Sequence, residues 1–139
     1  MPLVTVTRMR LRSIRFVPLF LIHAQRAIAQ IRKADGHLVG AVKRDGGLAY
    51  WTMSVWRDES AMLAYVASGA HRSAMKHLGD WCSEAGMVRW LANDATLPDW
   101  TQAARRLAEQ GRASRLKHPG PDHAGHAFAP PASLSQMRL

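Results

Sequence analysis

The chain has 139 residues, which is enough for one domain, and 47% of them are hydrophobic. This composition is typical of a globular protein with a packed core and excludes a largely disordered chain. The formal net charge of +9 favours anionic partners without identifying one.

The first half of the chain predicts three strands and one helix. Residues 3–11 alternate apolar and polar side chains, which is typical of a half-buried strand. A helix is expected from Pro18, since proline lacks an N–H group that the first helical turn leaves unused, and Gly36 is placed to end it. Residues 37–43 and 48–56 then predict a pair of strands joined by a Gly-rich turn.

The second half predicts three helices around one return strand. The candidate N-caps are Asp58 or Ser60 for the first helix and Ser68 for the second, because their side-chain oxygens can accept hydrogen bonds from the free N–H groups of the first helical turn. The expected elements are a helix to about residue 67, a helix over 68–81, a strand over 84–92 and a helix over 98–110. This order predicts an α+β protein with an antiparallel sheet, the ferredoxin-like split βαβ fold, and an extra C-terminal helix.

The strand over 48–56 is apolar on both faces, because Trp51, Met53 and Val55 alternate with Tyr50 and Trp56. Helices can cover only one of these faces. The other needs its own cover, since an exposed apolar sheet face promotes aggregation. We therefore expect a homodimer.

Residues 112–139 change to a Pro-, Gly-, His- and Ala-rich composition without apolar periodicity. Such a segment buries too little surface to offset its ordering entropy, so residues 1–111 form the predicted domain and 112–139 a flexible tail. The tail histidines, His118, His123 and His126, lack a carboxylate cluster and a rigid scaffold. We expect no metal site.

The sequence lacks the residues that several classes of protein require. Cys82 is the single cysteine, which excludes an intramolecular disulfide and a multi-cysteine metal site and fits a cytoplasmic protein. The longest apolar run, residues 16–22, falls far short of the ~20 residues of a membrane span, so we expect no membrane partner. Motifs of hydrolases, kinases and Rossmann oxidoreductases do not occur.

The strongest pattern lies between residues 50 and 90. An aromatic strand ends at Trp56, a charged turn and a helix follow, a Ser68-Gly69 break leads into a helix with His71 and Arg72, and a strand returns. This pattern resembles the small ferredoxin-like proteins of the antibiotic-biosynthesis-monooxygenase superfamily, and within it the relatives of spheroidene monooxygenase, over residues 3–91. The resemblance implies a dimeric α+β barrel with a cavity between helices and sheet. It also implies a monooxygenase-like protein that acts on or binds a hydrophobic or aromatic small molecule.

The resemblance also supplies candidate site residues. Cofactor-independent members oxidise electron-rich aromatic polyketides through a stabilised enolate-like anion. By this likeness His71 is the candidate proton shuttle and Arg72 its catalytic neighbour. The candidate substrate-binding residues are the aromatic Tyr50, Trp51, Trp56 and Trp90 and the cationic Arg8 and Arg89. Core packing for each Trp, and a backbone-bonded structural role for His71, remain alternatives.

The protein is expected to use either no cofactor or haem. Haem-degrading members place their proximal histidine on the helix after the strand-ending Trp. Counted from Trp56, that position falls on Met75, and the first strand has no asparagine to match their catalytic amide. A shift of two residues brings His77 to the ligand position, so His77 is the candidate ligand only if haem is bound.

Two other functions stay open. One is a non-catalytic ligand-binding or structural dimer. The other is binding of RNA, since ferredoxin-like sheets stack bases on exposed aromatics beside basic residues, and the first 46 residues hold nine basic and two acidic residues. The chain lacks the Gly-Phe-aromatic signature on its third strand, so nucleic acid is the least favoured partner.

Overall fold

The computed structural model describes residues 1–125, 127–131 and 136–139. Its elements are β1 (Leu3–Leu11), a 3-10 turn η1 (Ile14–Phe16), α1 (Val17–Arg32), β2 (His37–Asp45), β3 (Ala49–Trp56), α2 (Glu59–Val66), α3 (Gly69–Trp81), β4 (Cys82–Leu91), α4 (Trp100–Gln110), β5 (Arg112–Ala113) and β6 (Met137–Arg138). The predicted order of strands and helices is confirmed. His126, which was considered as a metal ligand, and residues 132–135 lie outside the described residues.

The described strands form one antiparallel sheet in the order β5-β4-β1-β3-β2-β6. β1 lies between β3 and β4, with Thr7 opposite Thr52 in β3 and Met87 in β4. Residues that face each other across antiparallel strands share one side of the sheet. Thr7 and Thr52 therefore point to the same layer. The fold is the predicted ferredoxin-like α+β arrangement.

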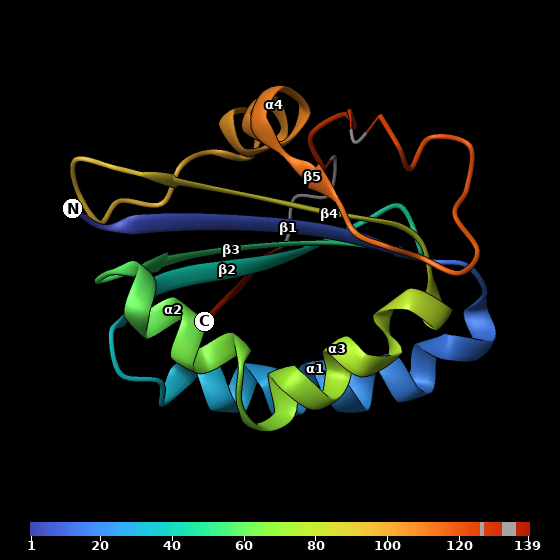
Figure 1. Cartoon of the computed structure of the whole chain (residues 1–139), viewed down its shortest axis with the longest axis horizontal. Helices are drawn as coiled ribbons and strands as arrows, with labels where there is room; N and C mark the ends of the chain where they lie inside the picture. The colour runs from blue at the N-terminus through green and yellow to red at the C-terminus, as the bar shows by residue number, and fades with distance from the viewer. Residues whose placement is uncertain (126, 132–135) are drawn as a thin grey trace.

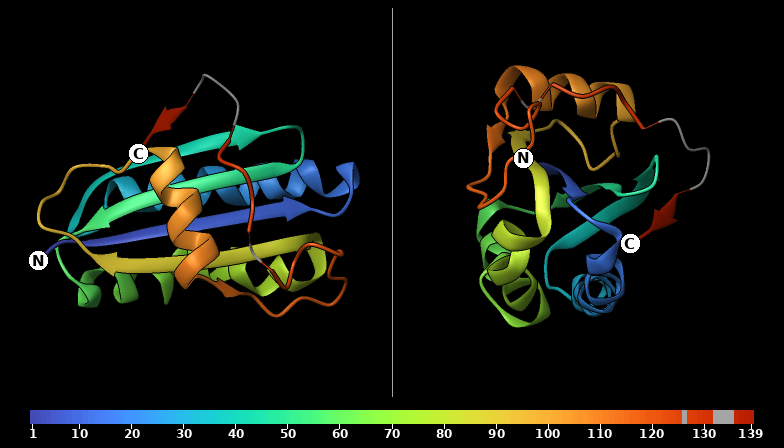
Figure 2. Two further views of the ribbon diagram at one scale, coloured as in Figure 1. Left: turned by 90° about the horizontal axis from the view of Figure 1, so that it is seen from above. Right: turned by 90° about the vertical axis from the view of Figure 1, so that its right-hand side faces the viewer.

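α1 and α3 lie side by side on one face of the sheet (Figure 1; Figure 2, right). Pro18 lies in the first turn of α1, as its missing N–H predicts. α2 begins after Asp58, whose carboxylate accepts the N–H of Ala61 at 2.8 Å, so Asp58 and not Ser60 is its N-cap. No described helix is long and apolar enough to cross a bilayer.

The opposite face of the sheet is covered by α4 of the same chain, which crosses the strands (Figure 2, left). Ala103, Ala104 and Leu107 pack in one buried cluster with Trp51 and Val55. The apolar face from which we predicted a second subunit thus has a cover within the chain. The homodimer stays a prediction that rests on the family resemblance.

The described part of the C-terminal segment also contacts the sheet, which its composition did not indicate. The N–H of Gly120 donates to the Ser83 carbonyl at 2.8 Å. His123 is only 7% exposed, and its Nδ1 accepts the N–H of Ala85 at 3.1 Å. Because Nδ1 is an acceptor, Nε2 carries the proton and donates to the Ser114 carbonyl at 2.7 Å.

Truncation after Lys117 is expected to lower the melting temperature by about 5 °C or more, roughly 1 kcal/mol for a domain of this size. The deletion removes His123 and leaves the buried N–H of Ala85 without its acceptor. Thermal unfolding of the truncated chain and of His123→Ala checks this. An unchanged melting temperature in both would show that the segment contributes no stability.

Candidate functional site

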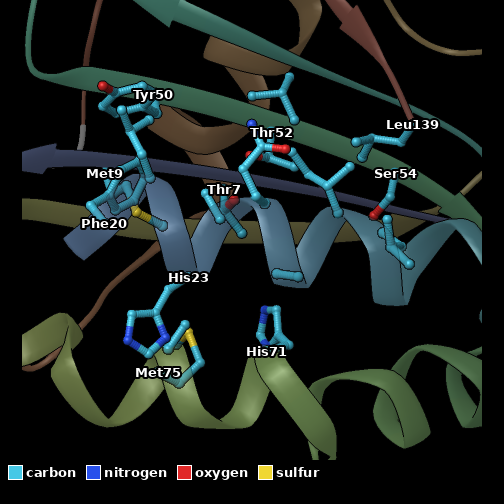
Figure 3. A pocket seen from close by; sticks show the side chains of 18 of the residues that line it. Thr7, Met9, Phe20, His23, Tyr50, Thr52, Ser54, His71, Met75 and Leu139 are labelled. Carbon is cyan, nitrogen blue, oxygen red and sulfur yellow. The ribbon is translucent and has the colours of Figure 1, made fainter. Parts of the chain in front are cut away.

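A cavity of about 500 Å³ lies between the sheet and the α1–α3 layer (Figure 3). This volume falls in the range of small-molecule sites, roughly 300–1,000 Å³. The helices contribute mostly apolar groups, which on α1 include those of Phe20, Ala24, Ala27, Ile28 and Ile31. The sheet contributes hydroxyl groups, namely those of Thr5, Thr7, Tyr50, Thr52 and Ser54.

Two of these hydroxyls form a pair on the sheet side. Ser54 Oγ lies 2.6 Å from Thr5 Oγ1, and it accepts the indole N–H of Trp56 at 2.9 Å. Within the pair one hydroxyl donates to the other, and the second keeps a free O–H in either case. The pair can therefore donate one hydrogen bond to a ligand oxygen.

A hydrogen-bonded junction positions His71 at the start of α3. The backbone N–H of His71 donates to Gln30 Oε1 at 2.9 Å, and Gln30 Nε2 donates to the carbonyls of Ser68 and Tyr65 at 2.9 and 3.2 Å. Gly69 has a φ of +61°, a conformation that favours glycine, and an added Cβ would lie 3.1 Å from the Gln30 amide. The Ser-Gly break is thus fixed against α1.

The His71 ring faces the cavity (Figure 3) and lies 4.8 Å from the Tyr65 ring, measured between centroids. Its Nδ1 is buried and has no hydrogen-bond partner among the described residues. Burial is the larger cause and lowers the pKa of His71, while an interaction with the Val66 backbone acts in the opposite direction. The imidazole is therefore neutral near pH 7 and able to accept a proton.

Two other titratable groups in the lining stay protonated. Burial raises the pKa of the Tyr65 phenol, whose O–H donates to the Ala27 carbonyl at 3.2 Å. Burial also raises the pKa of Cys82 to about 12, which leaves little thiolate for nucleophilic chemistry. Two histidines, His23 and His71, line the cavity, and of these only His71 has a buried ring nitrogen without a hydrogen-bond partner among the described residues.

The cavity brings together only some of the predicted site residues. His71 and Tyr50 line it. Among the described lining residues Arg72 and Trp56 do not occur: Arg72 is exposed on α3, and Trp56 is buried with its ring 5.2 Å from that of Tyr65. The catalytic role predicted for Arg72 has no support from this placement.

Four predicted substrate-binding residues lie elsewhere. Trp51 and Arg8 are buried on the α4 side of the sheet, and Trp90 packs there beneath the guanidinium of Arg106, 4.8 Å away. Arg89 is exposed on β4. Successive side chains of a strand point to opposite faces, so Arg8, Trp51 and Trp90 lie on the side of the sheet away from the cavity. Arg89 faces Thr5 and so lies on the cavity side, but it is exposed and is not among the described lining residues.

Several lining residues were missed by the sequence analysis, although their spacing contains the information. Thr52 and Ser54 follow Tyr50 at intervals of two, which places all three on one face of β3. Thr5 and Thr7 share that face by register. Tyr65 and His23 add to the lining from α2 and α1, and no comparable alternation in the sequence marks them.

The described residues do not fit a haem held by His77. The His77 side chain is exposed and does not line the cavity; it stacks on the lining residue Trp81, with centroids 4.8 Å apart and an interplanar angle of 9°. Within the described ranges, no group of three or more His, Cys, Asp and Glu side chains could hold a metal ion.

A family model described as a domain of unknown function, DUF3291, matches residues 23–138. The chain belongs to this family. No curated protein matches it. The match covers most of α1, the helices α2, α3 and α4, and every described strand except β1.

Solved structures confirm that this DUF3291 chain has a monooxygenase-like fold. SnoaB, a cofactor-independent oxygenase from Streptomyces nogalater, is 19% identical, with 70% of this chain and 98% of SnoaB covered at a TM-score of 0.54. A Nitrosomonas europaea protein assigned provisionally to the antibiotic biosynthesis monooxygenases is 12% identical, with coverages of 68% and 93% and a TM-score of 0.59. A conserved protein from Methanosarcina mazei Go1 is 14% identical, with coverages of 65% and 91% and a TM-score of 0.58.

Proposed function

We propose that the chain binds a hydrophobic aromatic molecule in the α1–α3 cavity and oxidises it with molecular oxygen, with His71 as the proton acceptor. The observation that carries this proposal is the ring of a neutral His71 on the wall of an otherwise mostly apolar cavity. The likeness in fold to SnoaB supports it.

The proposed reaction needs a substrate with an acidic CH₂ group that is conjugated through an aromatic ring to a ketone. His71 takes one proton from this carbon, and the Thr5–Ser54 hydroxyl pair on the opposite wall donates to the oxygen that gains negative charge. Oxygen then adds to the carbon. The CH₂ becomes C=O, the second oxygen atom leaves as water, and the four electrons lost by the carbon reduce O₂, so no further reductant is required.

Dithranol, an anthrone with such a CH₂ group, is a suitable probe. Ala74→Trp is expected to lower its affinity at least about tenfold, because Ala74 lines the cavity and the larger ring occupies ligand space. Ala29→Trp, on the exposed side of α1, is the matched control and should bind normally. Fluorescence titration measures binding, and equal affinities of both variants would place the ligand elsewhere.

Oxygen uptake with dithranol separates catalysis from binding alone. Non-catalytic binding is the second candidate function, and the interaction of His71 with the Val66 backbone favours it, because a core histidine is held in this way. Binding without oxygen consumption would support that alternative. An absorbance spectrum of the purified protein shows independently whether haem or flavin is bound. Base stacking on the sheet gains no support, since Trp51 and Trp56 are buried.

A further inference from the structure

The outer side of α1 combines exposed aliphatic side chains with uncompensated positive charge. Leu19 and Ile22, three residues apart on one side of the helix, are 52% and 49% exposed. Arg15 lies one turn before them, and Arg26 one turn after. Residues 1–34 hold seven Arg or Lys and no Asp or Glu. Arg8 and Arg12 pair with Glu84 and Asp80 on other elements, whereas Arg15 and Arg26 have no ion-pair partner among the described residues.

The apolar exposure is concentrated and continues on the neighbouring helix. Four of the ten large hydrophobic residues that are exposed in the described chain fall within residues 14–22. On α3, Met75 is 44% exposed between the exposed cations Arg72 and Lys76. The two helices form the outer layer of the molecule, and no described element covers their outer side (Figure 1).

We propose that this outer face, defined by Ile14, Arg15, Leu19, Ile22, Arg26, Arg72, Met75 and Lys76, docks onto an anionic membrane surface. Cationic side chains are attracted to acidic headgroups, while aliphatic side chains enter the boundary between headgroups and acyl chains. Both groups are interleaved here, which fits a lipid interface better than a nucleic acid, whose phosphates would leave Leu19 and Ile22 in water. The chain lies on the membrane and does not span it, a departure from our expectation of no membrane partner.

The cavity opens next to the proposed docking face, so docking would help a lipid-dissolved ligand to enter it. Leu21 and Met75 are exposed and also line the cavity, so the opening at these residues borders the docking face. A hydrophobic ligand dissolved in lipid would reach the cavity without crossing water. Docking itself needs no ligand and no chemistry at His71, so its test is independent of the proposed oxidation.

Vesicle sedimentation tests the proposal with the full chain and no added ligand. Binding is expected to vesicles of phosphatidylcholine with about one third phosphatidylglycerol, to weaken with added salt, and to be at least about tenfold weaker with phosphatidylcholine alone. Equal binding to the two vesicle types, or binding to neither, would overturn the proposal.

Two pairs of matched variants locate the surface. Leu19→Glu should weaken binding to the anionic vesicles about tenfold or more, whereas Leu91→Glu, at the end of β4 and 61% exposed, should not. Arg26→Gln should weaken it about fivefold, the equivalent of one lost surface cation, whereas Arg105→Gln on α4 should not. Equal losses within each pair would contradict the assignment. A change from dimer to monomer in Leu19→Glu would instead identify the face as an interface between two copies.

Discussion

Replacing Arg8 with methionine is expected to lower the free energy of unfolding by about 3–5 kcal/mol, because the change leaves a buried carboxylate without its partner. Arg8 Nη1 lies 2.6 Å from Glu84 Oε1, and the two side chains are only 7% and 12% exposed. The guanidinium also lies 3.7 Å from the centroid of the Phe128 ring. Loss of Arg8 thus affects both the ion pair and the docked C-terminal segment.

A double variant separates the effect of the unpaired Glu84 carboxylate from the effect of the lost packing. Arg8→Met with Glu84→Leu should recover much of the stability lost in Arg8→Met, since apolar residues of similar volume often replace a buried ion pair without cost. Arg57→Met is the control for an exposed pair: Arg57 contacts Asp35 at 3.4 Å, with side chains 55% and 91% exposed, and little change is expected. Urea unfolding measures all three, and equal losses for Arg8→Met and Arg57→Met would contradict the prediction.

The positions of most helices and strands could be predicted because their causes are local. Alternation identified β1, the proline at the first helical turn located α1, and the Ser68-Gly69 break separated α2 from α3. The start of β4 was placed two residues late, since Trp81 and Cys82 continue the apolar pattern of α3 across the boundary. Such boundaries depend on backbone geometry that side-chain type specifies only weakly.

The candidate site was only partly predictable, and one error was avoidable. Tyr50 and Trp51 were both predicted to bind substrate as aromatic residues, although adjacent strand residues must face opposite layers. Applying that alternation separates Trp51 and Arg8 from the cavity and brings in Thr52 and Ser54. The hydroxyl groups that the sheet contributes to the cavity are predicted more reliably by the alternation of strand residues than by the positions of aromatic residues.

The contacts of the C-terminal segment could not be inferred from sequence. Average composition describes residues 112–139 as a solvated segment, yet one histidine, His123, meets a free N–H on β4 that no local pattern reveals. Its acceptor role depends on the position of Ala85, 38 residues earlier. Long-range pairs of this kind are specified by the folded backbone, and the cover that α4 provides to the sheet is a second example.

His71→Ala is expected to lower dithranol turnover by about 10²-fold, the typical loss when a proton-transfer group is removed. Stability should change by no more than about 1 kcal/mol, because the ring is only partly buried and its Nδ1 has no partner within the described chain. His77→Ala is the matched control, since it removes the same ring from the same helix outside the cavity. Oxygen uptake and melting temperature are measured on each preparation.

The pH dependence of the same two variants provides a second, independent check on His71. Because burial lowers its pKa, the unfolded chain binds a proton more readily than the folded one. The stability that His71 contributes is therefore fully present above the ordinary histidine pKa of about 6.5 and is lost as pH falls through its lower folded value. His71→Ala should lose stability less steeply below that pH than His77→Ala, and wild-type turnover should fall over the same range. If stability is lost in His71→Ala while turnover per folded molecule is kept, the residue is a core histidine, and another group must accept the proton.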